Sequence, residues 1–173
     1  MSDIVVTPTG PSTGDLVCAG QIYKCALGRG DVTADKREGD GATPLGRFPI
    51  RLVMFRPDRV AAPDTRLPTR PLRKTDGWCD DPESPRYNQH IERPFAASHE
   101  IMWRDDHLYD IVVELGYNDA PAISGRGSAI FMHMARPDYD PTEGCVALAP
   151  EDLRRVLSDC AAKAFVVVNP RTA

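Results

Sequence analysis

The sequence predicts a mainly β protein with one helix. Short runs rich in β-branched and aromatic residues recur along the chain, and Gly, Pro, Asn or Asp bounds them, which is typical of strands. Only one stretch has convincing helical spacing. We expect strands at residues 4–6, 16–19, 21–27, 47–55, 109–115, 129–134 and 164–168.

The run at 21–27 has the clearest strand pattern. Polar and apolar side chains alternate along much of Gln-Ile-Tyr-Lys-Cys-Ala-Leu, as they do in a strand with one buried face. We therefore expect its polar side to meet water.

The expected helix covers residues 150–162. Its apolar side chains recur at three- and four-residue spacing: Leu153, Val156, Leu157, Cys160 and Ala161. Pro150 and two acids precede them. This order suits a helix start, because Pro lacks an N–H that the first turn leaves unpaired and acidic groups complement the helix dipole.

Residues 56–93 form a long region rich in Pro, Arg and Asp, with little periodicity. A passive connection of this length is uncommon in a compact domain. A functional lid and a solvated irregular excursion both stay open as interpretations.

Length and composition predict the number of domains and exclude some classes of partner. With 173 residues, 42% of them hydrophobic, we expect a single domain over residues 1–173. Lys and Arg number 21 against 25 Asp and Glu, and the net charge of -4 argues against a nucleic-acid partner. No apolar run approaches the roughly 20 residues of a membrane-spanning helix. The sequence does not indicate an oligomeric state.

The first six residues, Met-Ser-Asp-Ile-Val-Val, have neither the basic region nor the longer apolar region of a secretory signal. We therefore expect a cytoplasmic protein, or a periplasmic one if a signal has been removed from the chain.

The five cysteines predict neither a disulfide framework nor a metal site. Their number is odd, and they form no CxxC pair or zinc-type spacing with histidine. We expect no metal and no cofactor. Cys18, Cys25, Cys79 and Cys160 are interpreted as small buried hydrophobes, and Cys145 as the exception.

Cys145 and His133 suit thiol catalysis. A strand delivers the histidine, a short loop follows, and Thr-Glu-Gly-Cys ends at residue 145. A free thiol with a pKa of about 8.5 is mostly protonated at neutral pH unless an imidazole takes its proton. Gly144 lets a carbonyl substrate approach the backbone, so we expect the amide of Cys145, together with that of Gly144, to form an oxyanion hole.

Two further segments precede this pair along the chain, and the order of the three elements is informative. Residues 36–48, Lys-Arg-Glu-Gly-Asp-Gly-Ala-Thr-Pro-Leu-Gly-Arg-Phe, are a Gly-rich approach to a Thr-Pro-x-Gly turn. Residues 78–88, Trp-Cys-Asp-Asp-Pro-Glu-Ser-Pro-Arg-Tyr-Asn, form the second segment. In this order, the three elements resemble the L,D-transpeptidases with a YkuD-type catalytic domain, which act on peptidoglycan stem peptides.

The chain departs from the common family pattern at two positions. Glu143 stands where many members have histidine, and Ala147 where many have arginine. The roles of those side chains cannot be carried over, and the loop after His133 is short. Family members often orient the histidine through a backbone carbonyl, so Glu143 is not assigned to a triad.

The resemblance implies a mixed, largely antiparallel β-sandwich with one helix after the catalytic cysteine. It also implies that Cys145 attacks the diaminopimelate–D-alanine bond of a stem peptide or muropeptide and forms a thioester. With no export signal in view, an L,D-carboxypeptidase of cell-wall recycling is favoured over an exported L,D-transpeptidase that forms 3,3 cross-links.

Further residues are candidates for substrate contacts. Asp80, Asp81, Tyr87 and Asn88 lie in the family-like segment, although such residues often only form turns. Ser128 and Arg126 precede the histidine strand, and an arginine suits a stem-peptide carboxylate.

Two rival interpretations stay open. A catalytically idle peptidoglycan-binding module would suit the loss of the family's His and Arg. An unrelated Cys-His hydrolase would leave the segment at 36–48 unexplained.

Overall fold

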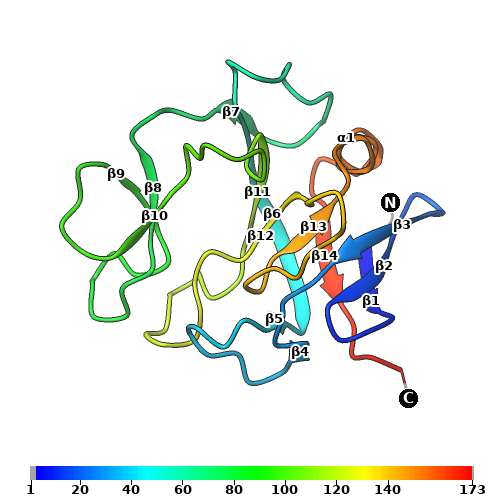
Figure 1. Ribbon diagram of the computed structural model, residues 1–173, viewed down its shortest axis with the longest axis horizontal. Helices are drawn as coiled ribbons and strands as arrows, with labels where there is room; N and C mark the ends of the chain where they lie inside the picture. The colour runs from blue at the N-terminus through cyan, green and yellow to red at the C-terminus, as the bar shows by residue number, and fades with distance from the viewer. Residues whose placement is uncertain (1–2, 173) are drawn as a thin grey trace.

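A nine-stranded sheet forms the body of the computed structural model, which describes residues 3–172 (Figure 1). Its strands lie in the order β11-β12-β13-β3-β2-β1-β14-β6-β7. Their bounds are β1 Ile4–Pro8, β2 Thr13–Cys18, β3 Gln21–Ala26, β6 Gly46–Phe55, β7 Thr69–Pro71, β11 Ile111–Leu115, β12 Phe131–Met134, β13 Val146–Leu148 and β14 Phe165–Val168. Met1, Ser2 and Ala173, on which the single-domain and signal predictions also rest, lie outside the described residues.

The large sheet closes on itself through β6. The first residues of this strand pair with β14, and residues 50–55 pair with β11. Most neighbouring strands are antiparallel, while β1–β14, β12–β13 and β6–β7 are parallel. The predicted mainly β, mixed and largely antiparallel sandwich-type fold is therefore confirmed. All seven predicted strands are present, with ends that differ by at most three residues.

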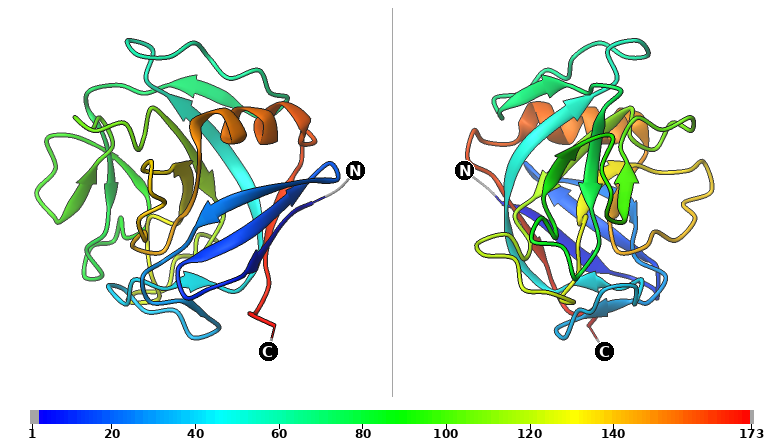
Figure 2. Two further views of the ribbon diagram at one scale, coloured as in Figure 1. Left: turned by 45° about the vertical axis from the view of Figure 1, so that its right-hand side comes forward. Right: turned by 90° about the vertical axis from the view of Figure 1, so that its left-hand side faces the viewer.

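The closed sheet encloses the main core. Side chains alternate along β1 and β2, so that Ile4, Val6, Leu16 and Cys18 are buried between the two halves of the sheet. The helix α1, Pro150–Asp159, covers one end of this core (Figure 2). It ends before the predicted residue 162, because the backbone of Cys160 is already extended.

The region at 56–93 is more regular than its sequence indicates. It contains β7 and two strands of a small second sheet, whose order is β10-β8-β9. The remaining bounds are β4 Val32–Thr33, β5 Thr43–Pro44, β8 Asp76–Cys79, β9 His90–Glu92 and β10 His99–Ile101. The small sheet stands beside the closed sheet in Figure 1, and Trp78 of β8 packs edge-on against Phe131 of β12, with ring centroids 5.0 Å apart.

Within the described residues, no helix is both long and apolar enough to span a membrane.

Candidate active site

The turn before β13 places Cys145 at the surface of a cavity. Thr142 fastens this turn, since its Oγ1 accepts a hydrogen bond from the Gly144 amide at 3.1 Å and donates one to the Cys145 carbonyl at 2.7 Å. Gly144 has a φ of 130°, and a Cβ at this position would lie 2.7 Å from the carbonyl oxygen of Ala42. The glycine is therefore required both by its backbone conformation and by this close approach.

The amides expected in the oxyanion hole differ in availability. The Gly144 amide is engaged by Thr142, whereas the structure gives the Cys145 amide no acceptor among residues 3–172. An uncommitted amide at the nucleophile is suited to receive a developing oxyanion. The geometry therefore favours the Cys145 amide over that of Gly144.

The sulfur of Cys145 lies between two backbone groups. Its thiol donates to the Ala129 carbonyl at 3.3 Å, and the Phe131 amide donates to the sulfur at 3.3 Å. The side chain is buried, which corrects the prediction that only the other four cysteines are. Burial raises the pKa of the Cys145 thiol to about 12. What distinguishes Cys145 is its place on the cavity wall, which none of the other four shares.

The imidazole of His133 has a defined tautomer. Its Nδ1 lies 2.8 Å from the Met134 carbonyl oxygen, and because a carbonyl only accepts, Nδ1 carries the proton. Nε2 is therefore the basic nitrogen. Burial lowers the pKa of His133 to about 4, so the ring and the thiol are both neutral in the resting protein at neutral pH. Glu143 takes no part in orienting this ring, because it is exposed and paired with Arg29 at 3.0 Å.

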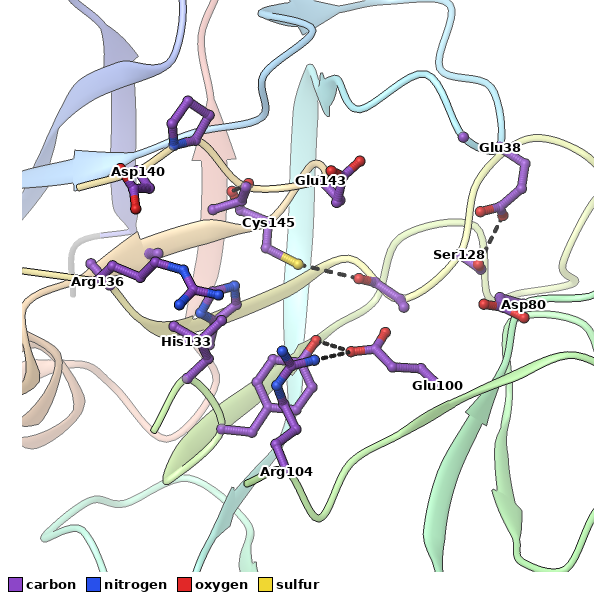
Figure 3. Close-up of a pocket in the computed structure, with 18 of the residues that line it drawn as sticks. Glu38, Asp80, Glu100, Arg104, Ser128, His133, Arg136, Asp140, Glu143 and Cys145 are labelled. Atoms are coloured by element: carbon purple, nitrogen blue, oxygen red, sulfur yellow. Dashed lines mark hydrogen bonds and ion pairs between the residues drawn. The ribbon is translucent and has the colours of Figure 1, made fainter. Parts of the chain in front are cut away.

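Strand pairing brings the two side chains to one place. β12 and β13 are parallel neighbours, with Met132 opposite Val146 and His133 opposite Ala147. Cys145 comes one residue before β13. Both side chains line a cavity of about 460 Å³, and Figure 3 shows them pointing into it.

The cavity walls carry charges of both signs. Arg104 and Arg136 lie on the side of His133, and Glu38, Asp80 and Ser128 lie on the other (Figure 3). The sequence indicated Ser128 and Asp80 as candidates, but it gave no signal for Glu38, Arg104 and Arg136. These three come from loops whose charges look like an ordinary solvated surface. No periodicity distinguishes them.

Arg104 and Glu100 both contact the buried side chain of Tyr109. Asp106 accepts two hydrogen bonds from the Arg104 guanidinium, at 2.8 and 2.7 Å, and this guanidinium lies 5.1 Å from the centre of the Tyr109 ring. The Tyr109 hydroxyl donates to Glu100, and burial raises the pKa of this carboxyl. The Tyr109 ring also packs against His133, with centroids 5.3 Å apart. This cluster supports one wall of the cavity.

Among the predicted substrate-binding residues, the structure places Ser128 and Asp80 on the cavity wall. The Ser128 hydroxyl donates to Glu38 at 2.8 Å. Arg126 points elsewhere and pairs with Asp35 at 2.8 Å. Asp81 forms a local turn, in which its carboxylate accepts from the Glu83 amide at 3.0 Å.

Tyr87 and Asn88 lie behind the wall, not on it. Both are buried. The Tyr87 hydroxyl donates to Glu38 and accepts from the Gly127 amide at 2.9 Å. The geometry thus gives these residues a supporting position in place of the direct substrate contact that the sequence suggested.

Comparison with known proteins agrees with this arrangement. The family model of the L,D-transpeptidase catalytic domain, YkuD, matches residues 18–168, a span that includes every residue of the cavity wall. No significant match was found among curated proteins or among solved structures.

Proposed function

Because this chain belongs to the L,D-transpeptidase family, we propose that it is an L,D-carboxypeptidase that removes the terminal D-alanine from soluble muropeptides. Membership of this family makes the protein a cysteine-dependent enzyme that acts on peptidoglycan. The observation that carries the proposal is the meeting of Cys145 and His133 in one charged cavity.

The first half-reaction forms a thioester. His133 Nε2 accepts the thiol proton, and Cys145 Sγ bonds to the carbonyl carbon at the L-centre of diaminopimelate. The carbonyl oxygen becomes an oxyanion, which the Cys145 amide stabilises. When the intermediate collapses, the C–N bond breaks and the imidazolium gives its proton to the amine of the departing D-alanine.

The second half-reaction releases the tripeptide. His133 takes a proton from water as the water oxygen attacks the thioester carbonyl. The C–S bond then breaks, and the proton returns to the sulfur. Atoms balance as one water consumed for each D-alanine released.

The charged walls support a stem-peptide substrate. Diaminopimelate and D-alanine bring carboxylates, and diaminopimelate also brings an ammonium group. Arg104 and Arg136 are suited to bind the carboxylates, while Glu38 and Asp80 are suited to bind the ammonium group.

The same walls favour water as the acceptor. A thioester survives for an amine only where a site excludes water. Here charged side chains line much of the cavity, and charged groups retain water. Hydrolysis is therefore the favoured fate of the acyl-enzyme.

The test is incubation with purified disaccharide tetrapeptide, followed by mass spectrometry. We expect tripeptide and free D-alanine as the main products, with no turnover by Cys145→Ala. Cys25→Ala is the matched control, since Cys25 is buried in the core away from the cavity. Dominant cross-linked dimer would make the enzyme a transpeptidase, and full activity of Cys145→Ala would overturn the mechanism.

A further inference from the structure

Asn88 makes a full set of hydrogen bonds behind the cavity. Its Oδ1 accepts from the Trp78 indole N–H and from the Ala129 amide, each at 3.0 Å. Its Nδ2 donates to the carbonyls of Tyr117 at 2.9 Å and Asn118 at 2.8 Å. The two donors and two carbonyls fix which atom of the amide is oxygen and which is nitrogen.

The contact with Ala129 leads directly to the nucleophile. Ala129 has a φ of 53°, a left-handed conformation that is uncommon for residues other than glycine and that its surroundings must hold. Its amide is bound by Asn88, and its carbonyl accepts from Cys145 Sγ at 3.3 Å. One residue thus joins Asn88 to the sulfur.

Trp78 reinforces the same segment from a second direction. Its indole N–H binds Asn88, and its ring packs edge-on against Phe131 with centroids 5.0 Å apart. The Phe131 amide is the other backbone group that contacts the sulfur. Trp78 and Asn88 together therefore contact both residues whose backbone holds the thiol.

We propose that Asn88 is a positioning residue, which sets the place of the Cys145 sulfur by holding the backbone of Ala129. This inference rests on the proposed role of Cys145 as nucleophile. Asn88 lies outside the cavity lining, so it acts on the chemical step and not on substrate binding.

Loss of the Asn88 side chain has a distinctive expected effect on the thiol. The Phe131 amide stays in place, since β12 pairs with β11 at Glu114 opposite Phe131. The Ala129 carbonyl loses its support. The thiol then loses the acceptor that favours its protonated form and keeps the donor that favours the thiolate, so its pKa falls.

The test compares Asn88→Gly, Asn88→Asp and Asn118→Gly. Asn88 has a φ of 55° and Asn118 a φ of 48°, so glycine keeps both backbone conformations, and Asn118 binds loop carbonyls without touching Ala129. For Asn88→Gly we expect kcat on the tetrapeptide to fall about tenfold or more, with KM nearly unchanged. Asn118→Gly should retain both values.

The second readout is iodoacetamide labelling at neutral pH, mapped by peptide for all five cysteines. In Asn88→Gly, Cys145 alone should label severalfold faster. Asn88→Asp keeps the Oδ1 acceptor but turns an oxygen toward two carbonyls, so it should show a smaller change in the same direction, and it carries the test if the glycine variant does not fold.

Unchanged kcat and unchanged Cys145 labelling would overturn the positioning role. Faster labelling of all five cysteines, with a lowered Tm, would overturn it as well, because that result indicates general loosening. Labelling does not depend on the acyl-transfer reaction, so failure of the proposed function, seen as activity in Cys145→Ala, is a separate outcome.

Discussion

The imidazole of His133 is oriented by the carbonyl of its own chain neighbour, Met134, at 2.8 Å from Nδ1. This bond leaves Nε2 as the base and makes an acidic third member unnecessary. We therefore expect His133→Ala to lower kcat by about 10²–10⁴-fold. Glu143→Gln should leave kcat close to wild type, because this side chain is exposed and paired with Arg29. A large loss of kcat in Glu143→Gln would instead indicate that Glu143 is the third member of a catalytic triad.

The resting state of the thiol predicts a steep pH dependence of labelling. Because burial raises the pKa of Cys145 to about 12, its thiolate fraction grows about tenfold for each pH unit across the neutral range. We expect iodoacetamide to modify Cys145 before the other four cysteines, since it alone lines the cavity, and its labelling rate to follow this slope. A rate independent of pH between about 6 and 9 would instead indicate a preformed thiolate–imidazolium pair.

The turn before the cysteine predicts a large effect from a small substitution. Gly144→Ala adds a Cβ that would meet the Ala42 carbonyl oxygen at 2.7 Å, at a φ of 130°. We expect a loss of about 1–3 kcal/mol in the free energy of unfolding, together with loss of activity. Gly125→Ala is the control, because it also has a positive φ but open space around it. Equal losses in the two variants would show that the close approach to Ala42 is unimportant.

Substitution of Arg136 and of Arg126 should have different effects on substrate binding. Arg136 and Arg126 are similarly exposed, with side-chain exposures of 50% and 44%, but only Arg136 lines the cavity. If Arg136 binds a stem-peptide carboxylate, Arg136→Gln should raise KM about tenfold while Arg126→Gln has little effect. Steady-state kinetics on the tetrapeptide measures both. A raised KM in Arg126→Gln and an unchanged KM in Arg136→Gln would indicate that Arg126 contacts the substrate.

The nature of the sequence signal explains what could be predicted. The seven strands with β-branched runs and the helix at Leu153, Val156 and Leu157 were predictable, because burial on one face imposes a periodicity. β13 was not, since a strand of three residues is too short to show a pattern. β8 and β9 were also missed, because side-chain contacts organise that region more than periodicity does.

The same contrast applies to the site. Cys145 and His133 belong to a local motif and were predictable from it. Glu100 lies in the short strand β10, and Arg104 and Tyr109 lie between β10 and β11, so only the tertiary fold brings them to the cavity. Asn88 was noticed for its place in a motif, but its hydrogen bonds to Ala129 and Trp78 depend on long-range packing.

Asp76 fastens the small sheet that carries Trp78. Its buried carboxylate accepts from Arg70 at 2.8 Å, from the Arg73 amide at 2.7 Å and from His90 at 2.7 Å. Burial alone would raise the pKa of Asp76, but these hydrogen bonds outweigh it and hold the pKa well below its usual range.

A depressed folded-state pKa means that the ionised group stabilises the fold above the unfolded value of about 3.9, and that this stability is lost as the pH falls below it. We therefore expect Asp76→Asn to lower the free energy of unfolding at neutral pH by about 2–3 kcal/mol, because the variant replaces a fully buried carboxylate whose hydrogen bonds to Arg70, Arg73 and His90 are strengthened by its charge. Urea unfolding at several pH values measures this difference, and the gap between wild type and variant should narrow as the pH falls below about 4. Asp35→Asn is the control, since Asp35 is exposed and its ion pairs with Arg37 and Arg126 lie at the surface, where such pairs contribute little. A gap that stays constant as the pH falls would mean that the charge of Asp76 does not hold the small sheet.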